Sequence, residues 1–335
     1  MSPPPAKVAL LGAGRMGEVH GRNAAANPRL DLAYLAEPRG SAGKRLADAL
    51  GCRIASLAEV LADPAVDGVI VATSTDAHLD LTLAALAAGK AVFCEKPLDL
   101  ELARLKANVG VLANPVRPLV VGFNRRFDPH FQALKARIDA GEIGALETLA
   151  IVNHDPAPPP PGFVATSGGL FRDFTIHDFD LAAWLFGAPP GEVFAWAECL
   201  VDPAIGAAGD VDTARLILRW PSGQLCSISN TRRSRYGYDQ RVEAFGSKGA
   251  AMAGNPRLST VETWSEAGTL AAPIYPGFAT RYAASYRAEL EHFAAVLAGE
   301  TEPTPAYAAS VAALELADAA MRSLKTGAAA KVGAP

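Results

Sequence analysis

A histidine and an aspartate that could bind hydroxyl groups and accept a proton lie close together in the sequence, near the middle of the chain. Asp173 and His177 are four residues apart within residues 168–180, so on a helix they would share one face and could grip neighbouring hydroxyl groups of one molecule. Imidazole titrates near neutral pH, which suits a general base. The pair therefore predicts proton removal from an alcohol, with a structural histidine held by Asp173 or Asp180 as the alternative.

Lys96 is the candidate for the positive group that such a reaction needs. It follows the apolar run 91–94 and lies between Glu95 and Pro97, whose ring restricts the turn. An ammonium group beside the reacting oxygen would stabilise a developing alkoxide, and it would keep a nearby histidine neutral by lowering the pKa of the imidazole. A solvated surface lysine is the alternative.

A glycine-rich loop near the N-terminus predicts the group that would accept the hydride of the alcohol. Gly12-Ala13-Gly14-Arg15-Met16-Gly17 follows an apolar run and precedes a helical segment, which is the context of a dinucleotide-binding G-x-G-x-x-G loop. The first glycine allows a tight turn, the second lets the pyrophosphate approach the backbone, and the third lets helix and strand pack closely. The expected pyrophosphate-binding residues are Gly12, Gly14, Arg15, Met16 and Gly17.

An acidic residue after the next apolar run predicts which dinucleotide binds. Glu37 follows Gly17 by twenty residues, where a carboxylate accepts hydrogen bonds from the adenosine ribose and repels a 2′-phosphate. We therefore expect NAD as the cofactor. Arg39 leaves some use of NADP open, because a guanidinium group can bind a 2′-phosphate, although an ordinary surface arginine is the alternative.

Two later segments should also line the cofactor site, since ligands of an open parallel sheet bind at the carboxyl ends of its strands. Each segment directly follows a predicted strand. Helix capping by Ser74 or Thr75 would explain part of the first segment equally well. The expected contacts are Thr73, Ser74, Thr75, His78, Glu95 and Lys96.

The elements that must position these residues begin with an α/β region. Short apolar runs alternate with Ala- and Leu-rich segments up to Gly122, which predicts a doubly wound parallel sheet. The expected strands are 8–11, 30–36, 68–72, 91–94 and 119–122, and the expected helices are 17–26, 42–50, 56–61, 78–88 and 100–114. We expect residues 1–122 to form an NAD-binding Rossmann domain.

Beyond Gly122, strand-like runs follow one another without intervening helices. This predicts an α+β domain with a large, mostly antiparallel, open sheet over residues 123–335. The expected strands are 146–153, 193–200, 213–220, 223–231 and 240–245, and the expected helices are 129–140, 179–186, 282–298 and 306–326. The last three helices could cover one face of the sheet, and the other face could pair with a second subunit. We expect substrate binding and oligomerisation here.

Composition and charge exclude several classes of function. The 335 residues carry a formal net charge of −4 without a basic block, which argues against a nucleic-acid partner. Four widely spaced cysteines and the lack of clustered Cys and His residues argue against a metal site or a disulfide framework. No run reaches the roughly 20 apolar residues of a membrane span, and no signal-peptide pattern is present. We expect a cytoplasmic protein without a membrane partner.

Four motifs together resemble one protein family over essentially the whole chain. They are the glycine-rich loop, Glu95-Lys96-Pro97-Leu98, Gly122-Phe123-Asn124-Arg125-Arg126-Phe127-Asp128 and residues 173–177. The set is similar to the glucose–fructose oxidoreductase / inositol dehydrogenase / rhizopine catabolism (Gfo/Idh/MocA) family. The proline-rich segment 156–162, which is otherwise a candidate linker, and residues 167–180 resemble the substrate loop and catalytic motif of its inositol 2-dehydrogenases.

The resemblance implies a function and a set of site residues. It implies a homotetrameric NAD-dependent enzyme that oxidises the axial hydroxyl of myo-inositol to 2-keto-myo-inositol, with His177 as the base and with Lys96 and Asp173 completing a catalytic trio. The implied substrate contacts are Lys96, Arg126, His154, Asp173, His177, Tyr236 and Tyr282. Such enzymes more often carry Asp in place of Glu37 and Arg in place of His154, so the exact polyol stays open.

Two other functions stay open at this point. A dehydrogenase of a hexopyranose such as glucose or galactose would act on a similar set of hydroxyl groups. A catalytically silent NAD-binding redox sensor would share the fold without the reaction, because a fold does not determine a function. The joint presence of Lys96, Asp173 and His177 argues against the sensor.

Overall fold

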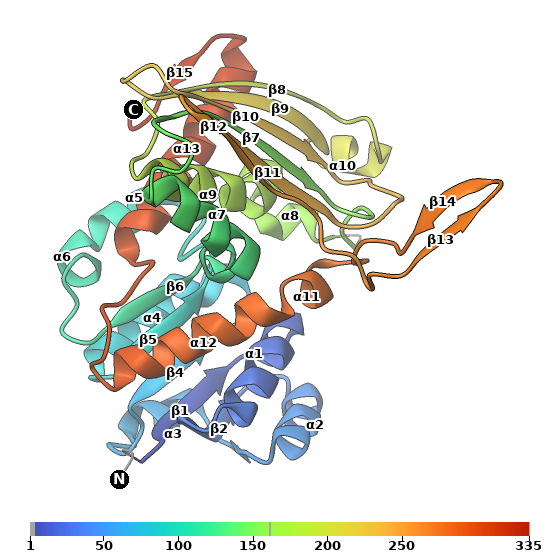
Figure 1. Ribbon diagram of the computed structural model, residues 1–335. Helices are drawn as coiled ribbons and strands as arrows, with labels where there is room; N and C mark the ends of the chain where they lie inside the picture. Colours follow the sequence, from blue (N-terminus) through green and yellow to red (C-terminus); the bar gives the residue numbers. More distant parts are fainter. Residues whose placement is uncertain (1–3, 161, 335) are drawn as a thin grey trace. The chain divides into compact units, whose positions relative to one another are not determined.

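Two structural units make up the chain in the computed structural model, which describes residues 4–160 and 162–334 (Figure 1). One unit comprises residues 1–127 and 285–311, and the other comprises residues 128–284 and 312–335. The expected single boundary after Gly122 therefore describes the division only in part, because the chain returns to the first unit near its C-terminus. No helix in the described part of the chain is long and apolar enough to cross a membrane.

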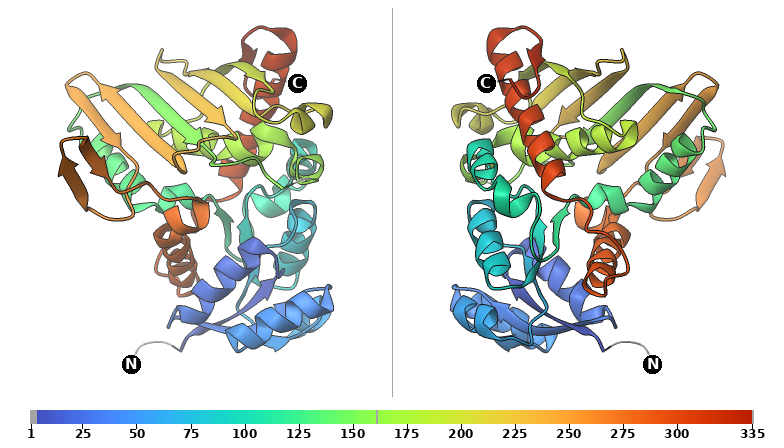
Figure 2. Two further views of the ribbon diagram at one scale, coloured as in Figure 1. Left: turned by 90° about the vertical axis from the view of Figure 1, so that its right-hand side faces the viewer. Right: turned by 90° about the vertical axis from the view of Figure 1, so that its left-hand side faces the viewer.

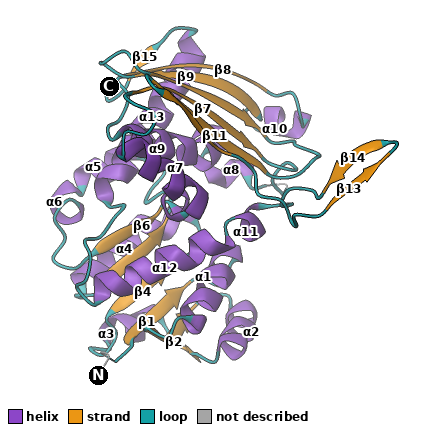
Figure 3. Cartoon of the chain, in the orientation of Figure 1, coloured by secondary structure: helices purple, strands orange, loops and turns teal. Residues whose placement is uncertain are grey.

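The first unit is built on a sheet of six parallel strands in the order β3-β2-β1-β4-β5-β6. This is the strand order of a fold with two βαβαβ halves that binds dinucleotides. Strands β1, β2, β4 and β6 of this sheet are labelled in Figure 3. The central strands are buried almost throughout, which is why they are continuous apolar runs in the sequence. The short, exposed β3 lacks this signal and was not predicted. The strands are β1 (Ala6–Leu11), β2 (Leu30–Ala36), β3 (Arg53–Ile54), β4 (Gly68–Val71), β5 (Ala91–Glu95) and β6 (Leu119–Gly122).

Helices connect these strands. Ser56 begins one of them with a capping box, in which its hydroxyl accepts the Glu59 N–H and the Glu59 carboxylate accepts the Ser56 N–H. The single helix expected over 100–114 is divided at Asn108, whose side chain donates to the Arg104 carbonyl. The helical elements are α1 (Arg15–Ala26), α2 (Gly40–Leu50), α3 (Leu57–Ala62), η1 (Thr75–Ala77), α4 (His78–Ala87), α5 (Leu102–Ala107), α6 (Val109–Leu112) and η2 (Asn124–Phe127).

The core of the first unit includes α12 (Ala283–Leu297), a helix from far along the sequence. Its residues Leu290 and Phe293 pack in one cluster with Ile70 and other strand residues. Gly68 in β4 makes room for the helix, since a Cβ at this position would lie 3.0 Å from Cζ of Phe293. The prediction that this helix covers the antiparallel sheet is therefore wrong. An apolar stripe shows that a helix packs against something, but it does not specify the surface.

The second unit contains a sheet of seven strands in the order β12-β11-β7-β10-β9-β8-β15. All neighbouring pairs are antiparallel except β10 and β7, which confirms the expected mostly antiparallel sheet. The strands are β7 (Leu146–His154), β8 (Glu192–Glu198), β9 (Thr213–Arg219), β10 (Leu225–Thr231), β11 (Asp239–Gly246), β12 (Gly249–Ala253) and β15 (Ala330–Lys331). A separate hairpin consists of β13 (Glu262–Ser265) and β14 (Gly268–Ala271). Four of these strands, β12, β13, β14 and β15, were not predicted, because they are short and mostly exposed.

Helices cover one face of the seven-stranded sheet, and the opposite face is open (Figure 2). Buried and exposed residues alternate along β8 to β11, as expected for a sheet with one covered face. Ser323 of α13 accepts the N–H of Ala195 in β8 at 3.0 Å. The open face exposes Trp196, Ile217, Leu225 and Phe245. The helical elements of this unit are α7 (Pro129–Asp139), α8 (Val164–Ser167), η3 (Phe171–Thr175), α9 (Ile176–Phe186), α10 (Pro203–Ala207), α11 (Phe278–Arg281) and most of α13 (Tyr307–Thr326).

Candidate active site

The glycine-rich loop between β1 and α1 is tightly packed at two positions and open at a third. Gly12 has a φ of +104°, and a Cβ there would lie 2.6 Å from the carbonyl oxygen of Ala72. A Cβ on Gly17 would lie 2.2 Å from the carbonyl oxygen of Gly12. A Cβ on Gly14, by contrast, would meet nothing within 4 Å. Gly14 therefore presents accessible backbone at the start of α1, which suits an anion such as a pyrophosphate.

Arg15 and Met16, also expected at the pyrophosphate, differ in their surroundings. Arg15 is exposed in the first turn of α1. Met16 is half-buried and packs against the apolar core of the unit. Of these two side chains, that of Arg15 is accessible to a ligand, whereas that of Met16 contributes mainly to packing.

Glu37 lies just beyond β2 and binds the glycine-rich loop. Its Oε2 accepts the Ala13 N–H at 2.8 Å, and its Oε1 accepts both the backbone N–H and the Nε–H of Arg39 at 2.9 Å. The side-chain hydrogen bond from Arg39 is the main reason that the pKa of Glu37 falls to about 2, and burial opposes this shift only in part. Glu37 is therefore ionised, and the guanidinium group of Arg39 is bound to it.

The segments after β4 and β5 follow neighbouring strands at the carboxyl edge of the sheet. His78 is buried and joins them, with Nδ1 2.8 Å from the Pro97 carbonyl oxygen and Nε2 3.3 Å from the Thr73 carbonyl oxygen. Burial lowers the pKa of His78, which favours the neutral ring. Ser74 precedes η1 without a side-chain capping bond, so the capping alternative is not observed for this residue.

Lys96 and Arg126 follow neighbouring strands at the same edge. Lys96 comes directly after β5, and Arg126 lies in η2 just after β6. The buried carboxylate of Glu95 accepts the Lys96 N–H at 3.1 Å through Oε2. Gly122 leaves room for this carboxylate, because a Cβ at position 122 would lie 3.3 Å from Oε2. The first unit thus brings Lys96 to the sheet edge that also carries the glycine-rich loop.

In the second unit Asp173 is fixed by an arginine that was not predicted from the sequence. Arg232, just after β10, is 4% exposed and donates from Nη2 to Asp173 at 3.0 Å and from Nη1 to Asp155 at 3.1 Å. Its guanidinium carbon also lies 4.6 Å from the centroid of the Phe174 ring. Arg232 and Asp173 are 59 residues apart, so no local spacing could indicate the pair.

Asp173 and His177 lie on two kinds of helix. Asp173 is in η3, which is a π-helical turn, and His177 is in the first turn of α9. The helix expected to begin at Phe179 therefore starts earlier, and Asp173 and His177 do not belong to one regular α-helix. Single π-helical turns are rare and occur frequently at functional sites.

A buried polar network supports the start of α9. Asp178 accepts hydrogen bonds from the side-chain amides of Asn153 at 2.9 Å and Asn230 at 2.8 Å. The hydroxyl of Thr175 donates to Asn230 at 2.6 Å. Because Asp178 directly follows His177, these bonds fix the helical turn that carries the histidine.

Tyr282 extends this network. Gln240 donates to the side-chain oxygen of Asn153 at 2.7 Å and accepts the Tyr282 hydroxyl at 3.1 Å. Tyr282 is 2% exposed, so its phenol contributes to the interior of the second unit. Its role as a substrate contact stays a prediction.

His154 and Tyr236 belong to a second polar cluster. Nε2 of His154 lies 2.7 Å from Oγ of Ser229, and its Nδ1 lies 3.9 Å from Asp239. The Tyr236 hydroxyl donates to Asp239 at 2.7 Å. Burial lowers the pKa of His154, which favours a neutral ring that can donate and accept. Asp239 thus brings together two of the residues that were expected to contact the substrate, and that contact stays a prediction.

Comparisons with known proteins identify the family of this chain. Residues 6–123 match a family model described as an oxidoreductase family with an NAD-binding Rossmann fold, and residues 131–252 match the GFO/IDH/MocA C-terminal domain. The chain belongs to the GFO/IDH/MocA oxidoreductase family. This membership confirms the predicted family, the fold class and NAD as the cofactor.

Similarity to other members of the GFO/IDH/MocA family extends over almost the whole chain. The chain is 44% identical to the inositol 2-dehydrogenase of Rhizobium meliloti (strain 1021), over 94% of this chain and 96% of that protein. A myo-inositol dehydrogenase from Corynebacterium glutamicum has a crystal structure that matches with a TM-score of 0.94 at 40% identity, covering 99% of this chain and 100% of that one. The scyllo-inositol dehydrogenase from Lactobacillus casei with bound NAD(H) and scyllo-inositol matches with a TM-score of 0.92 at 25% identity, covering 98% and 100%.

The first unit of this family member fits NAD. The accessible backbone at Gly14 lies at the N-terminus of α1, where an anion is favoured. The ionised carboxylate of Glu37 lies after the second strand, where it can accept hydrogen bonds from ribose hydroxyls. The guanidinium group of Arg39 pairs with Glu37, so binding of a 2′-phosphate by Arg39 would require this ion pair to break.

Proposed function

We propose that this member of the GFO/IDH/MocA family is an NAD-dependent inositol 2-dehydrogenase that oxidises myo-inositol to 2-keto-myo-inositol. The observation that carries the proposal is its 44% identity to an inositol 2-dehydrogenase along 96% of that protein's length. The location of Lys96 at the carboxyl edge of the parallel sheet and the fixed carboxylate of Asp173 in the second unit add support.

In this proposal the chain's own residues bind the cofactor and handle the proton. Gly14 and Glu37 hold the pyrophosphate and the adenosine ribose. Bound NAD supplies the hydride acceptor. His177 removes the proton of the reacting hydroxyl as general base, and the ammonium group of Lys96 stabilises the negative charge that develops on the oxygen.

Asp173 orients the polyol in this mechanism. Arg232 occupies Oδ2 of Asp173, so the carboxylate has a fixed direction and can accept a hydrogen bond from a hydroxyl next to the reacting one. The cluster of His154 and Tyr236, together with Arg126, would bind the remaining hydroxyls. A ring with several hydroxyl groups offers partners to all of these polar side chains, which favours a cyclic polyol over an apolar alcohol.

We also propose that the protein works as a cytoplasmic homotetramer assembled through the open face of the seven-stranded sheet. Trp196, Ile217, Leu225 and Phe245 are exposed on that face, and large exposed apolar surfaces commonly mark interfaces. Light scattering coupled to size-exclusion chromatography tests this point. The tetramer is expected for the wild type, and Ile217→Lys should give smaller species, whereas a monomeric wild type would refute the assembly.

The decisive test of the activity is a substrate panel. NADH formation is followed at about 340 nm (nicotinamide absorbance) with myo-inositol, scyllo-inositol, D-chiro-inositol, D-glucose and D-galactose, each with NAD and with NADP. Turnover of myo-inositol with NAD is the expected outcome. Turnover of the two hexoses alone would replace the proposal with a hexopyranose dehydrogenase. Cofactor binding without turnover of any compound would replace it with a redox sensor.

A further inference from the structure

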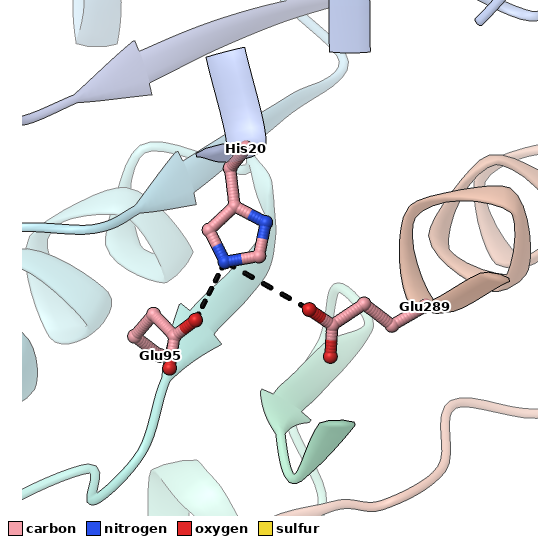
Figure 4. Close-up of side chains that lie close together, drawn as sticks. All are labelled: His20, Glu95 and Glu289. Atoms are coloured by element: carbon pink, nitrogen blue, oxygen red, sulfur yellow. Dashed lines mark hydrogen bonds and ion pairs between the residues drawn. The ribbon is translucent and has the colours of Figure 1, made fainter. Parts of the chain in front are cut away.

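Three ionisable side chains meet in the interior of the first unit: His20 on α1, Glu95 at the end of β5 and Glu289 on α12 (Figure 4). We refer to them as the buried triad. His20 and Glu289 are completely buried, and Glu95 is 7% exposed. Nε2 of His20 lies 2.5 Å from Oε1 of Glu95 and 3.8 Å from Oε1 of Glu289. One imidazole nitrogen therefore faces two carboxyl groups.

The apolar surroundings of the buried triad make an unpaired charge energetically unfavourable. The rings of Phe93 and Tyr286 pack edge-on against His20, with centroids 5.1 and 5.8 Å away. Both oxygens of Glu289 are buried and have no hydrogen-bond partner in the described part of the chain. Buried polar atoms of folded proteins nearly always have a partner. The negative charge of two neighbouring buried carboxyl groups must therefore be balanced by a positive group.

A divalent cation or protons could balance them, and the geometry favours protons. The candidate ligand atoms lie within 4.8 Å of one another. A zinc ion would lie about 2.0–2.2 Å from each ligand in a tetrahedral arrangement, which keeps ligand atoms roughly 3.3 Å apart. The 2.5 Å between His20 and Glu95 is a hydrogen-bond distance. A proton fits between these two atoms, and a metal ion does not.

The two carboxyl groups take different charge states. Burial is the largest influence on the pKa of Glu95 and would raise it, but the hydrogen bond from His20 and the positive charges of His20 and Lys96 lower this pKa overall. Burial raises the pKa of Glu289 well above its usual range, and the charge of Glu95 adds to this effect. Glu95 is therefore the more acidic of the two and carries the negative charge, whereas Glu289 is the one that retains a proton more readily.

Glu95 connects the triad to Lys96. One carboxylate oxygen is bound to His20, and the other accepts the Lys96 N–H at 3.1 Å. The ionised carboxylate thus fixes the backbone of Lys96, and its negative charge interacts with the positive charge of Lys96. If Glu95 became protonated, the bond to His20 would weaken and that charge would be lost.

We propose that His20 and Glu289 are positioning residues for Lys96, which act by keeping Glu95 as the single hydrogen-bonded carboxylate of the buried triad. The inference rests on the proposed role of Lys96 in polyol oxidation. According to this inference, the fall of kcat on the acid side of the pH profile (the acid limb) depends on His20, a residue without any expected contact to substrate. The charged or titratable groups that face Glu95 are His20, Glu289, Lys96 and His78.

The test compares variants of His20 in the full-length enzyme. His20→Leu removes the partner of Glu95, so kcat at pH 7 should fall at least about 10-fold. The acid limb of kcat should move to higher pH by roughly one unit or more, because Glu95 then protonates more easily. The KM for NAD should stay within about threefold, as expected for a loss confined to the chemical step. His20→Gln retains an N–H near the place of Nε2 and should restore most of both losses. Glu291→Gln, on the exposed part of the same helix as Glu289, is the matched control and should change neither value.

A purely structural role of His20 gives a different result. His20→Leu would then unfold at a lower temperature while its acid limb stayed in place, and this outcome overturns the inference. About one equivalent of a transition metal in the purified wild type, measured by mass spectrometry after acid digestion, would also overturn it.

A third measurement separates this inference from the proposed function. In the nuclear magnetic resonance spectrum of histidine-labelled protein, the proton on Nε2 of His20 should resonate far downfield and should disappear in Glu95→Gln. If the wild type oxidises no polyol, the proposed function fails while this signal still tests the triad. If the wild type is active and the signal is absent, the triad fails alone.

Discussion

The guanidinium group of Arg232 bridges two carboxylates, with Nη2 3.0 Å from Asp173 and Nη1 3.1 Å from Asp155. All three side chains belong to the second unit, and Arg232 is almost fully buried there. The bridge ties the π-helical turn before α9 to the ends of β7 and β10. The direction of the Asp173 carboxylate is therefore set by a residue far away in the sequence.

Removal of this bridge should destabilise the protein and impair catalysis. Arg232→Ala leaves two partly buried carboxylates without their cation, and breaking a buried ion pair typically costs about 3–5 kcal/mol of unfolding free energy. We expect kcat/KM for the polyol to fall at least about 10-fold. Denaturant unfolding and NADH formation measure the two effects. Arg233→Ala, at the exposed neighbouring position, is the control, and equal behaviour of the two variants would contradict this role.

Replacement of His177 should affect the chemical step rather than cofactor binding. His177→Asn removes the proposed base, so kcat should fall by about 10² to 10⁴-fold, whereas the dissociation constant for NADH should stay within about threefold. Stopped-flow measurement of the first turnover distinguishes slow chemistry from slow product release. A variant that retains more than a tenth of the wild-type single-turnover rate would exclude His177 as the base.

Replacement of Glu37 should change the cofactor preference. Glu37→Gln removes the charge that repels a 2′-phosphate and releases Arg39 from its ion pair. The ratio of kcat/KM for NADP to that for NAD should rise at least about 10-fold. The double variant Glu37→Gln with Arg39→Ala should lose this gain. If the double variant favours NADP as strongly as the single one, Arg39 takes no part in the preference.

The stability conferred by residue 289 should depend on pH in a defined direction. The pKa of Glu289 is raised above its usual value of 4.5 in the folded protein, so the unfolded chain loses this proton first as the pH rises. The pH-dependent penalty of keeping the buried acid neutral is therefore absent below about pH 4 and grows as the pH rises to the folded pKa. Glu289→Gln cannot ionise and should gain in Tm relative to the wild type between pH 5 and pH 8, by about 2–4 °C for each kcal/mol. An unchanged difference in Tm across this range would show that Glu289 is ionised when folded.

The parallel sheet and the places of the candidate residues at its carboxyl edge could be predicted because the relevant signals are local. β1 and the glycine-rich loop are contiguous, and Glu37 follows one strand further on. The buried strands β4 and β5 are apolar throughout, so their carboxyl ends and the residues that follow them could be located directly. Lys96 was proposed as a site residue in this way, and its role stays a prediction.

The parts that were missed depend on contacts between distant residues. The residues next to Arg232 in the sequence form no recognisable motif. Its hydrogen bond to Asp173 forms only because the end of β10 lies beside the turn that carries Asp173. The pairing of His20 and Glu289 was not predicted, because each obtains its environment from the other and from Glu95. The π-helical turn was also missed, since the four-residue spacing between Asp173 and His177 is equally typical of an α-helix.

The packing of α12 against β4 has a consequence for the order of events during synthesis. The first 127 residues leave the ribosome long before Leu290 and Phe293, which complete the core around Ile70. During that interval the nascent parallel sheet has an apolar surface that its own segment cannot bury, so the N-terminal part alone should bind chaperones and aggregate when expressed as a fragment. The nucleotide-binding unit becomes a finished domain only when nearly the whole chain has been translated.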